Sequence, residues 1–240
     1  MIYLLRADTA DTADTADTRG GDALTHKNVR LLPLLEIRFH DLHISQSDIA
    51  SFDYILFTSK NAIKSIAAQA SLNQIKDKPA LCISCALKKL WLDSGGTSAL
   101  SPSDFCEANG FYSGKQFAKL ISPFVAGARI LYLCGSDRAT DFGGLLGEAV
   151  VREVVVYSSI ESDPDKAPHA FDDKSIFIFG SPKHYKTFCK HYGWNQSWLA
   201  ISLGDTTFEA FSKDIQRLNA KGDFTKAIEV ASAICDSRPS

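Results

Sequence analysis

Short apolar segments alternate with amphipathic segments along most of this 240-residue chain. The apolar segments have the length and the residue content of strands, and they lie at 2–6, 29–32, 53–58, 79–84, 129–134, 151–157, 175–180 and 198–203. Helical patterning is found at 60–70, 85–94, 113–122, 138–149, 182–191, 206–219 and 224–234. Strands that alternate with helices form parallel sheets covered by helices. The sequence therefore predicts an α/β fold.

One strand-to-helix junction occurs twice. "ILFTSKNAIKSI" at 55–66 and "IFIFGSPKHYKTF" at 176–188 both pass from a buried strand through a polar turn into a helix. Each is followed by a second strand, turn and helix, namely "ALCISCALKKL" at 80–90 and "WLAISLGDTTFEAF" at 198–211. A repeated series of this kind favours two similar lobes over one continuous sheet.

These polar turns have two interpretations. Open α/β sheets bind ligands at the carboxyl ends of their strands, and helix amino termini suit anionic groups. Alternatively, the Ser, Thr and Asp residues only cap the helices that follow. Lys60 and Lys183 can likewise be solvated lysines in a first helical turn. Both interpretations stay open for any single turn.

Composition excludes several classes of protein. A formal net charge of −2 argues against general nucleic-acid binding, which usually needs a basic surface. No stretch approaches the ~20 continuous apolar residues of a membrane span. The start, "MIYLLRADTA", lacks the pattern of a signal peptide. We therefore expect a cytoplasmic protein without a membrane or nucleic-acid partner.

The cysteines do not indicate a metal or redox centre. Cys82 and Cys85 form a C-x-x-C between a strand and a helix, which is the setting of a thioredoxin-like pair. However, no Gly-Pro separates them and Cys82 falls inside the predicted strand, which favours structural thiols. No second Cys or His pair has zinc-ligand spacing, and no G-x-G-x-x-G or P-loop is present. The repeat "DTADTADTADT" at 8–18 predicts a surface loop or a disordered segment.

The order and spacing of several motifs resemble the uroporphyrinogen-III synthase family. The motifs are "PLLEI" at 33–37, "ILFTSKNAI" at 55–63, "ARILYLCGSDRATDFGGLL" at 128–146, "EVVVYSS" at 153–159, and the turns "IFIFGSPKHY" and "ISLGDTTFEAF". The chain departs from the family pattern at three places. Ser84 and Cys85 replace Gly and Thr, Gly180 replaces Thr, and Leu5-Arg6-Ala7 stands for an amino-terminal "TRP".

The resemblance implies a particular arrangement of the chain. It implies two α/β lobes with parallel sheets, one formed by residues 1–35 plus 159–240 and the other by residues 40–153. Residues 36–39 and 154–158 would form a two-stranded β linker. The active site would be the cleft between the lobes, faced by the polar turns. The family also leads us to expect a monomer.

The resemblance further implies an activity. The family cyclises hydroxymethylbilane, a chain of four pyrroles with eight carboxylates, with loss of water and inversion of the last ring. A spiro intermediate leads to uroporphyrinogen III. The pyrrole nitrogens supply the electrons, so we expect no cofactor and no metal, and hand-over from the preceding deaminase is possible. The alternative is a non-enzymatic two-lobed binding protein for a small anionic metabolite.

The site residues follow from the substrate that the resemblance implies. Carboxylates are bound by backbone N–H groups, hydroxyls and cations. The matching positions are Thr58, Ser59, Lys60, Asn61, Ser84, Gly135, Ser136, Arg138, Ser181, Lys183, Gly204, Thr206 and Thr207. Arg138 can alternatively pair with Asp137 or Asp141, and Asp205 can be only a helix cap. Tyr157, at the end of a strand, is the candidate catalytic residue, as a donor to the departing hydroxyl.

Overall fold

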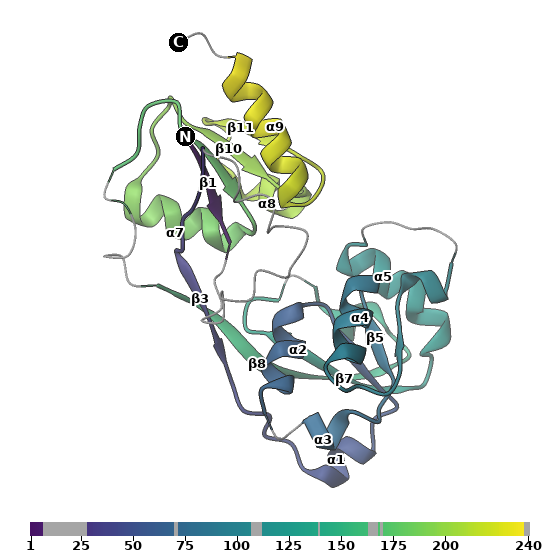
Figure 1. Ribbon diagram of the computed structural model, residues 1–240. Helices are drawn as coiled ribbons and strands as arrows, with labels where there is room; N and C mark the ends of the chain where they lie inside the picture. Colours follow the sequence, from purple (N-terminus) through teal and green to yellow (C-terminus); the bar gives the residue numbers. More distant parts are fainter. Residues whose placement is uncertain are drawn as a thin grey trace. The chain divides into compact units, whose positions relative to one another are not determined.

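The computed structural model contains two parallel sheets flanked by helices, which confirms the predicted α/β fold (Figure 1). It describes residues 1–6, 28–69, 72–106, 112–138, 140–162, 168 and 170–237, so the Asp-Thr repeat at 8–18 lies outside the described residues. The chain divides into two compact units. Unit 1 is Met1–Ile37 with Ile160–Ser240, and unit 2 is Arg38–Ser159.

Unit 1 is a five-stranded sheet in the order β11-β10-β9-β1-β2, with all four strand pairs parallel. Its strands are β1 (Ile2–Leu5), β2 (Val29–Leu31), β9 (Ile176–Phe179), β10 (Leu199–Ser202) and β11 (Gln216–Asn219). Its helices are α7 (Pro182–Tyr192), α8 (Asp205–Ala210) and α9 (Phe224–Ser237). Strand β1 lies between β9 and β2, so the first strand of the chain is placed inside the sheet.

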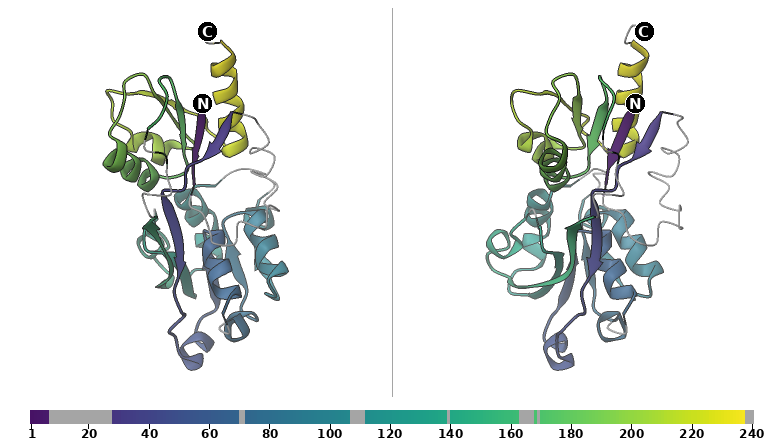
Figure 2. Two further views of the ribbon diagram at one scale, coloured as in Figure 1. Left: turned by 60° about the vertical axis from the view of Figure 1, so that its left-hand side comes forward. Right: turned by 90° about the vertical axis from the view of Figure 1, so that its left-hand side faces the viewer.

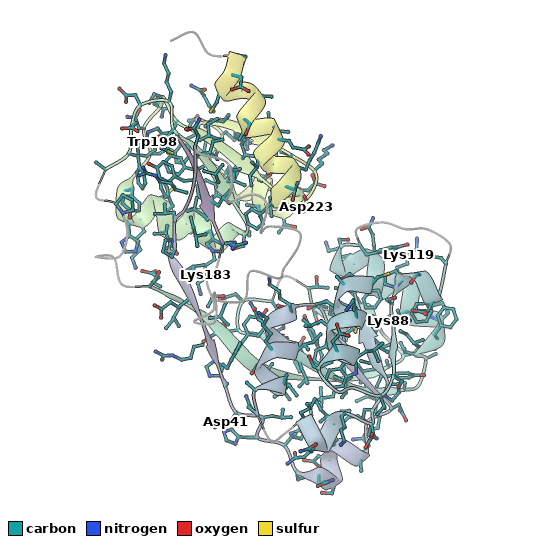
Figure 3. All side chains as sticks on the ribbon, in the orientation of Figure 1. Asp41, Lys88, Lys119, Lys183, Trp198 and Asp223 are labelled. Carbon is teal, nitrogen blue, oxygen red and sulfur yellow. The ribbon has the colours of Figure 1, made fainter. Side chains whose placement is uncertain are left out.

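The two faces of the unit 1 sheet have different cores. Successive residues of a strand point to opposite faces, so Phe177 and Phe179 pack toward α7 and α8. Ile176 and Ile178 pack toward α9. The α7 face is rich in rings; Trp198 in Figure 3, for example, lies 5.1 Å from Phe177 between ring centroids. Burying large aromatic side chains of this kind is a main source of stability for the unit.

Unit 2 contains most of a six-stranded sheet in the order β3-β8-β7-β4-β5-β6 (Figures 1 and 2). The strands are β3 (Leu35–Phe39), β4 (Tyr54–Phe57), β5 (Ala80–Cys82), β6 (Ala99–Leu100), β7 (Arg129–Gly135) and β8 (Val150–Glu161). The helices are α1 (Gln46–Ala50), α2 (Lys60–Ala67), α3 (Leu72–Ile75), α4 (Cys85–Asp93), α5 (Gly114–Ile121) and α6 (Phe142–Leu145), with short 3₁₀ turns at Pro102–Asp104 and Ser122–Phe124. The chain passes between the units along β3 and β8, which are neighbours in the sheet.

Both faces of the unit 2 sheet are covered. Helices α1 to α4 pack on the face that carries Phe57 and Leu133. Helices α5 and α6 pack on the face that carries Leu56 and Tyr132. Strands β4 and β7 are therefore buried on both sides, as their nearly continuous apolar sequences indicate.

Two predicted helices are much shorter in the structure. In the segment predicted as helix 206–219, helix α8 ends at Ala210, because Phe211 has an extended backbone with ψ of 143°. The last residues of the segment form strand β11 instead. Among the described residues of the segment predicted as helix 138–149, only the single turn α6, Phe142–Leu145, is helical. Glycines within it lower its helix propensity.

The two cysteines of the C-x-x-C differ in environment. Cys82 is buried in β5, and burial raises the pKa of its thiol to about 12. Cys85 is exposed at the start of α4, and both thiols are free. A thiol that stays protonated at neutral pH is a poor partner for disulfide exchange, which favours the structural interpretation for Cys82.

Candidate active site

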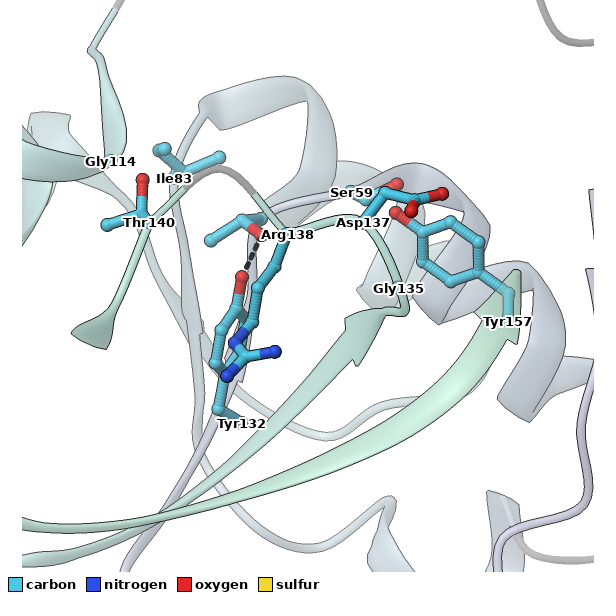
Figure 4. A pocket seen from close by; sticks show the side chains of 10 residues that line it. Ser59, Ile83, Gly114, Tyr132, Gly135, Asp137, Arg138, Thr140 and Tyr157 are labelled. Carbon is cyan, nitrogen blue, oxygen red and sulfur yellow. Dashed lines mark hydrogen bonds between the residues drawn. The ribbon is translucent and has the colours of Figure 1, made fainter. Parts of the chain in front are cut away.

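A cavity of about 250 Å³ lies within unit 2, at the carboxyl ends of its strands (Figure 4). It is lined by Thr58, Ser59, Ile83, Gly114, Tyr132, Gly135, Asp137, Arg138, Thr140 and Tyr157. The sequence predicts five of these as site residues: Thr58, Ser59, Gly135, Arg138 and Tyr157. The structure thus brings together residues from the turns after β4 and β7 and from strand β8.

The turn after β4 supplies two hydroxyls. Ser59 is the N-cap of α2, and its Oγ accepts a hydrogen bond from the Asn61 N–H at 3.2 Å. The Thr58 hydroxyl lies 2.9 Å from the hydroxyl of Tyr132 on β7. The capping interpretation is therefore confirmed for Ser59, but a capping hydroxyl uses its oxygen as acceptor and keeps its O–H as a donor.

An irregularity in strand β8 precedes Tyr157. Cys134 of β7 pairs with Val155, and the next residue, Gly135, pairs with Tyr157, so Val156 is an extra residue in the ladder. The Val156 carbonyl accepts hydrogen bonds from the His40 N–H at 2.9 Å and from the Ser65 hydroxyl at 2.7 Å. A bulge re-aims the side chains that follow it and is common beside active sites. This bulge directs Tyr157 into the cavity.

Gly135 allows the close approach of the Tyr157 ring. A Cβ atom at Gly135 would lie 2.5 Å from Cζ of Tyr157 and 2.8 Å from its hydroxyl oxygen. Both distances are shorter than van der Waals contact. The absence of a side chain at Gly135 is therefore what leaves room for the phenol.

The two phenols in the cavity are hydrogen-bond donors at neutral pH. Burial raises the pKa of Tyr132 to about 12, although its hydrogen bond with Thr58 acts in the opposite direction. Burial also raises the pKa of Tyr157, and a hydrogen bond with the Ser59 side chain partly offsets this effect. Both phenols are therefore protonated at neutral pH, and each is able to donate a hydrogen bond.

Arg138 is paired across the sheet. Its Nη2 lies 2.6 Å from Oε2 of Glu153 on strand β8. Asp141, one of the two predicted local partners, instead caps α6 by accepting a hydrogen bond from the Gly144 N–H at 3.0 Å. Asp137, the other, lines the cavity. Sequence spacing alone could not identify Glu153, because it reaches Arg138 through the β7–β8 pairing.

Four further candidates in unit 2 lie outside the cavity lining. Lys60 and Asn61 are in the first turn of α2, Ser84 is the N-cap of α4, and Ser136 follows β7. The Ser84 Oγ accepts a hydrogen bond from the Leu87 N–H at 3.3 Å, so Ser84 also has a structural role. These four stay proposed contacts at the same edge of the sheet.

The candidates in unit 1 lie at the carboxyl ends of β9 and β10. Ser181 is the N-cap of α7, and Lys183 is in the first turn of that helix (Figure 3). Gly204 is the N-cap of α8, followed by Thr206, which is exposed, and Thr207, which is 6% exposed. Asp205 is not the cap; its carboxylate accepts a hydrogen bond from the Asn219 amide at 2.7 Å.

His184 lies beside the Ser181 turn and is buried at 5% exposure. Its Nδ1 is hydrogen-bonded to the Ser181 hydroxyl at 2.8 Å, and the oxygen of that hydroxyl also accepts from the His184 N–H at 3.4 Å. Burial lowers the pKa of His184 to about 4, from an ordinary value of 6.5. The imidazole is therefore neutral at pH 7.

The lowered pKa of His184 predicts a loss of stability in acid. In the unfolded chain the imidazole takes up a proton at about pH 6.5, whereas in the folded chain it does so only near pH 4. The contribution of the neutral imidazole to the free energy of unfolding is therefore fully present above pH 6.5 and decreases as the pH falls from 6.5 to about 4. At about 1.36 kcal/mol per pH unit, the total is about 3 kcal/mol. We expect urea unfolding at pH 7 and pH 4.5 to show this loss, and His184→Gln to show a smaller one. Equal pH dependence of the two proteins would contradict the prediction.

Half of the lining residues are not predicted from the sequence. Tyr132 was treated only as part of a strand, and Gly114 and Thr140 come from segments outside the repeated turns. Asp137 was considered only as a partner for Arg138. Its position in a largely polar segment directly after a buried strand is the signal that could have identified it.

The described residues show neither a cluster of metal ligands nor a helix that could span a membrane. No group of three or more His, Cys, Asp and Glu side chains among them is arranged to hold a metal ion. None of their helices combines the length and the apolar character needed to cross a membrane.

The fold has solved relatives. A crystal structure of uroporphyrinogen-III synthetase from Helicobacter pylori 26695 is similar, with a TM-score of 0.70 and 21% identity over 98% of this chain and 100% of that chain. A mutant uroporphyrinogen III synthase from the extremely thermophilic bacterium Thermus thermophilus has a TM-score of 0.53 and 10% identity, covering 98% of both chains. At these identities the two structures support the fold alone.

Sequence comparisons give the family. A search of curated proteins finds no match. The family described as uroporphyrinogen-III synthase HemD matches residues 26–220. This match extends from β2 to β11 and covers most of the chain. The chain therefore belongs to the uroporphyrinogen-III synthase family.

Proposed function

We propose that the cavity of unit 2 is the place where this member of the family acts on the reacting end of hydroxymethylbilane. The family reaction is the cyclisation of that tetrapyrrole, with loss of water, to uroporphyrinogen III. The observation that supports the cavity is the placement of Tyr157, whose phenol is directed into it by the Val156 bulge and accommodated by Gly135. A protonated phenol in a partly enclosed site suits a departing hydroxyl.

The size of the cavity supports binding of part of the substrate. A volume of about 250 Å³ corresponds to roughly eight water molecules at ~30 Å³ each. That is room for one substituted pyrrole ring. Whole ligands of drug size occupy roughly 300–1,000 Å³, and a tetrapyrrole chain belongs at the upper end of that range. The other three rings would therefore bind elsewhere on the protein.

In the proposed mechanism the protein holds the substrate in position, and the substrate itself supplies the electrons for the reaction. Tyr157 donates a hydrogen bond to the oxygen of the hydroxymethyl group as its carbon–oxygen bond breaks. The pyrrole nitrogen supplies the electron pair that expels it. Holding the ends of the chain in a reactive arrangement lowers the entropic part of the barrier and excludes the simple closure to the type I isomer.

The remaining candidates would bind the carboxylates. In unit 2 these are the hydroxyls and the cation of the turn after β4, with Ser84, Ser136 and the backbone N–H groups there. In unit 1 they are Ser181 and Lys183 at α7, and Gly204, Thr206 and Thr207 at α8. All of them except Ser136, which follows β7, are at a helix start, where N–H groups favour anions. We further propose a cytoplasmic monomer that receives its substrate from the preceding deaminase.

The proposal is tested by following product isomers. Hydroxymethylbilane is generated from porphobilinogen by its deaminase, the protein is added, and the oxidised products are separated by chromatography. We expect mainly the type III isomer, including after treatment of the protein with a chelator and desalting. Without the protein, spontaneous closure gives the type I isomer.

Two outcomes would contradict the proposal. The type I isomer alone, with the protein present, would indicate a binding protein without this activity. Activity that is lost on chelation and restored by a divalent metal would show that a metal takes part in the reaction.

A further inference from the structure

We propose that Ser65 is a positioning residue for the reaction, because its hydroxyl holds the bulge of strand β8 that directs Tyr157 into the cavity. This inference rests on the proposed function of the cavity, in which Tyr157 donates a hydrogen bond to the departing hydroxyl. It adds a residue in the middle of helix α2 that does not itself line the cavity.

The bulge changes the face of the sheet on which Tyr157 lies. Successive residues of a strand point to opposite faces. Val154 and Val156 pack with the core under helices α1 to α4, whereas Val155 between them is exposed. Regular alternation would place Tyr157 on the face of Val155, yet Tyr157 packs against the same core as Val156. The extra residue in the ladder at Val156 therefore moves the phenol to the face covered by α2.

Ser65 is placed to hold this bulge. It is fully buried inside α2, although serine is a poor residue for a helix interior. A serine in such a position commonly donates to the carbonyl four residues before it. The Ser65 hydroxyl instead donates to the Val156 carbonyl of strand β8 at 2.7 Å. Its contact with the His40 carbonyl is longer, at 3.5 Å, so the Val156 carbonyl is the better acceptor for the single hydroxyl proton.

A second side chain of the same region orients the Ser65 hydroxyl. The Gln69 Nε2 donates to the Ser65 Oγ at 3.2 Å and to the His40 carbonyl at 2.8 Å. Because the Ser65 oxygen accepts from Gln69, its own proton is available for a carbonyl. The Val156 carbonyl also accepts from the His40 N–H at 2.9 Å. The bulge is thus bonded both to the segment after β3 and to helix α2.

Helix α2 therefore acts on the phenol and on the backbone that carries it. Tyr157 directly follows the carbonyl that Ser65 holds, and Figure 4 shows the hydroxyl end of Tyr157 close to Ser59, the N-cap of α2. Displacing a reacting group by about 1 Å can lower a rate ~10²-fold. Loosening the bulge should therefore lower turnover while the fold is kept.

Ser65→Ala is the first test. Alanine keeps the helix and removes the hydroxyl. The Val156 carbonyl keeps its hydrogen bond from His40, so we expect kcat to fall roughly tenfold, less than the roughly 100-fold loss expected for Tyr157→Phe. KM should stay near the wild-type value, because an interaction made only in the transition state affects kcat alone.

Two other variants accompany Ser65→Ala. Ser175→Ala is the matched control, because Ser175 is also fully buried and donates to a backbone carbonyl at 2.7 Å, but belongs to unit 1. Its kcat should equal that of the wild type. Gln69→Leu leaves Ser65 in place and removes the donor that orients its hydroxyl. Gln69 is only partly buried, so this variant empties no enclosed site, and its kcat should fall roughly threefold.

A double variant separates positioning from a structural role. If Ser65 acts only through the phenol hydroxyl, Ser65→Ala should cause no further loss when it is added to Tyr157→Phe. A loss of folded protein or of substrate binding would instead lower kcat/KM by the same factor in both backgrounds.

The position of the phenol is also measured without substrate. Tyrosine labelled with ¹³C at Cζ is incorporated, and the Tyr157 resonance is assigned by its absence from the spectrum of Tyr157→Phe. We expect this resonance to shift or broaden in Ser65→Ala and to be unchanged in Ser175→Ala.

Three results would overturn the inference. They are a wild-type kcat in Ser65→Ala, an equal loss in the presence and absence of the Tyr157 hydroxyl, and an unchanged Tyr157 resonance. Should Ser65→Ala not fold, the same three measurements on Gln69→Leu decide in its place. If the wild type yields no type III isomer, the proposed function fails instead, and the resonance alone then decides whether Ser65 positions Tyr157.

Discussion

Replacing Tyr157 with phenylalanine is expected to lower turnover about 100-fold. The substitution removes the hydroxyl and keeps the ring, so the contact with Gly135 and the packing of β8 are preserved. A positioned general acid typically raises the reaction rate ~10²–10⁴-fold. We expect Tyr157 to contribute at the lower end of this range, because burial raises its pKa and makes proton transfer harder. The rate is measured as type III product per unit time, with the melting temperature as a check on folding.

Loss of a single hydroxyl from a turn should have a smaller effect. Ser59→Ala and Thr207→Ala each remove one group among many that could bind the substrate, at roughly 0.5–1.5 kcal/mol per lost hydrogen bond. Ser59→Ala also removes the cap of α2, so its melting temperature should fall. A wild-type rate in Tyr157→Phe together with an inactive Thr207→Ala would transfer the catalytic role to unit 1.

Much of the fold follows from local sequence patterns. Each segment predicted as a strand is present, because apolar runs such as "RILYLC" in β7 are short, rich in branched and aromatic residues, and bounded by polar turns. The helix predicted at 206–219 failed for a tertiary reason. Residues Gln216–Asn219 pair with β10 and complete the sheet edge, and this pairing overrides a weak helical pattern.

The candidate site was predictable only in part. Hydroxyls at the ends of strands can be read from sequence, since Ser59, Ser84 and Ser181 each directly precede a helix. The Val156 bulge could not be predicted, because it depends on the register between β7 and β8. The pairing of Arg138 with Glu153 depends on the same register, so it could not be predicted either.

Replacing Gly135 with alanine is expected to lower turnover about as much as removal of the Tyr157 hydroxyl. The new methyl group would lie 2.5 Å from Cζ and 2.7 Å from Cε2 of the ring, so the phenol has to move. Gly135 is buried at the end of β7, with little freedom for the backbone to yield instead. Overpacking of this kind typically costs about 1–3 kcal/mol of stability, so the variant should fold with a lowered melting temperature. Its turnover should fall roughly 100-fold, because Tyr157 loses its position beside Ser59.

A control and a double variant make this expectation specific to the phenol. Gly147→Ala is the matched control, since a Cβ at Gly147 would meet no atom within 4 Å, and its rate should equal that of the wild type. If Gly135 acts only by making room for the hydroxyl, the losses in Gly135→Ala and Tyr157→Phe are not additive. Residues that act through one group behave in this way. The double variant should then be about as slow as either single variant. A multiplicative loss of roughly 10⁴-fold would show that Gly135 contributes separately, and a wild-type rate in Gly135→Ala would show that the ring position is not needed for turnover.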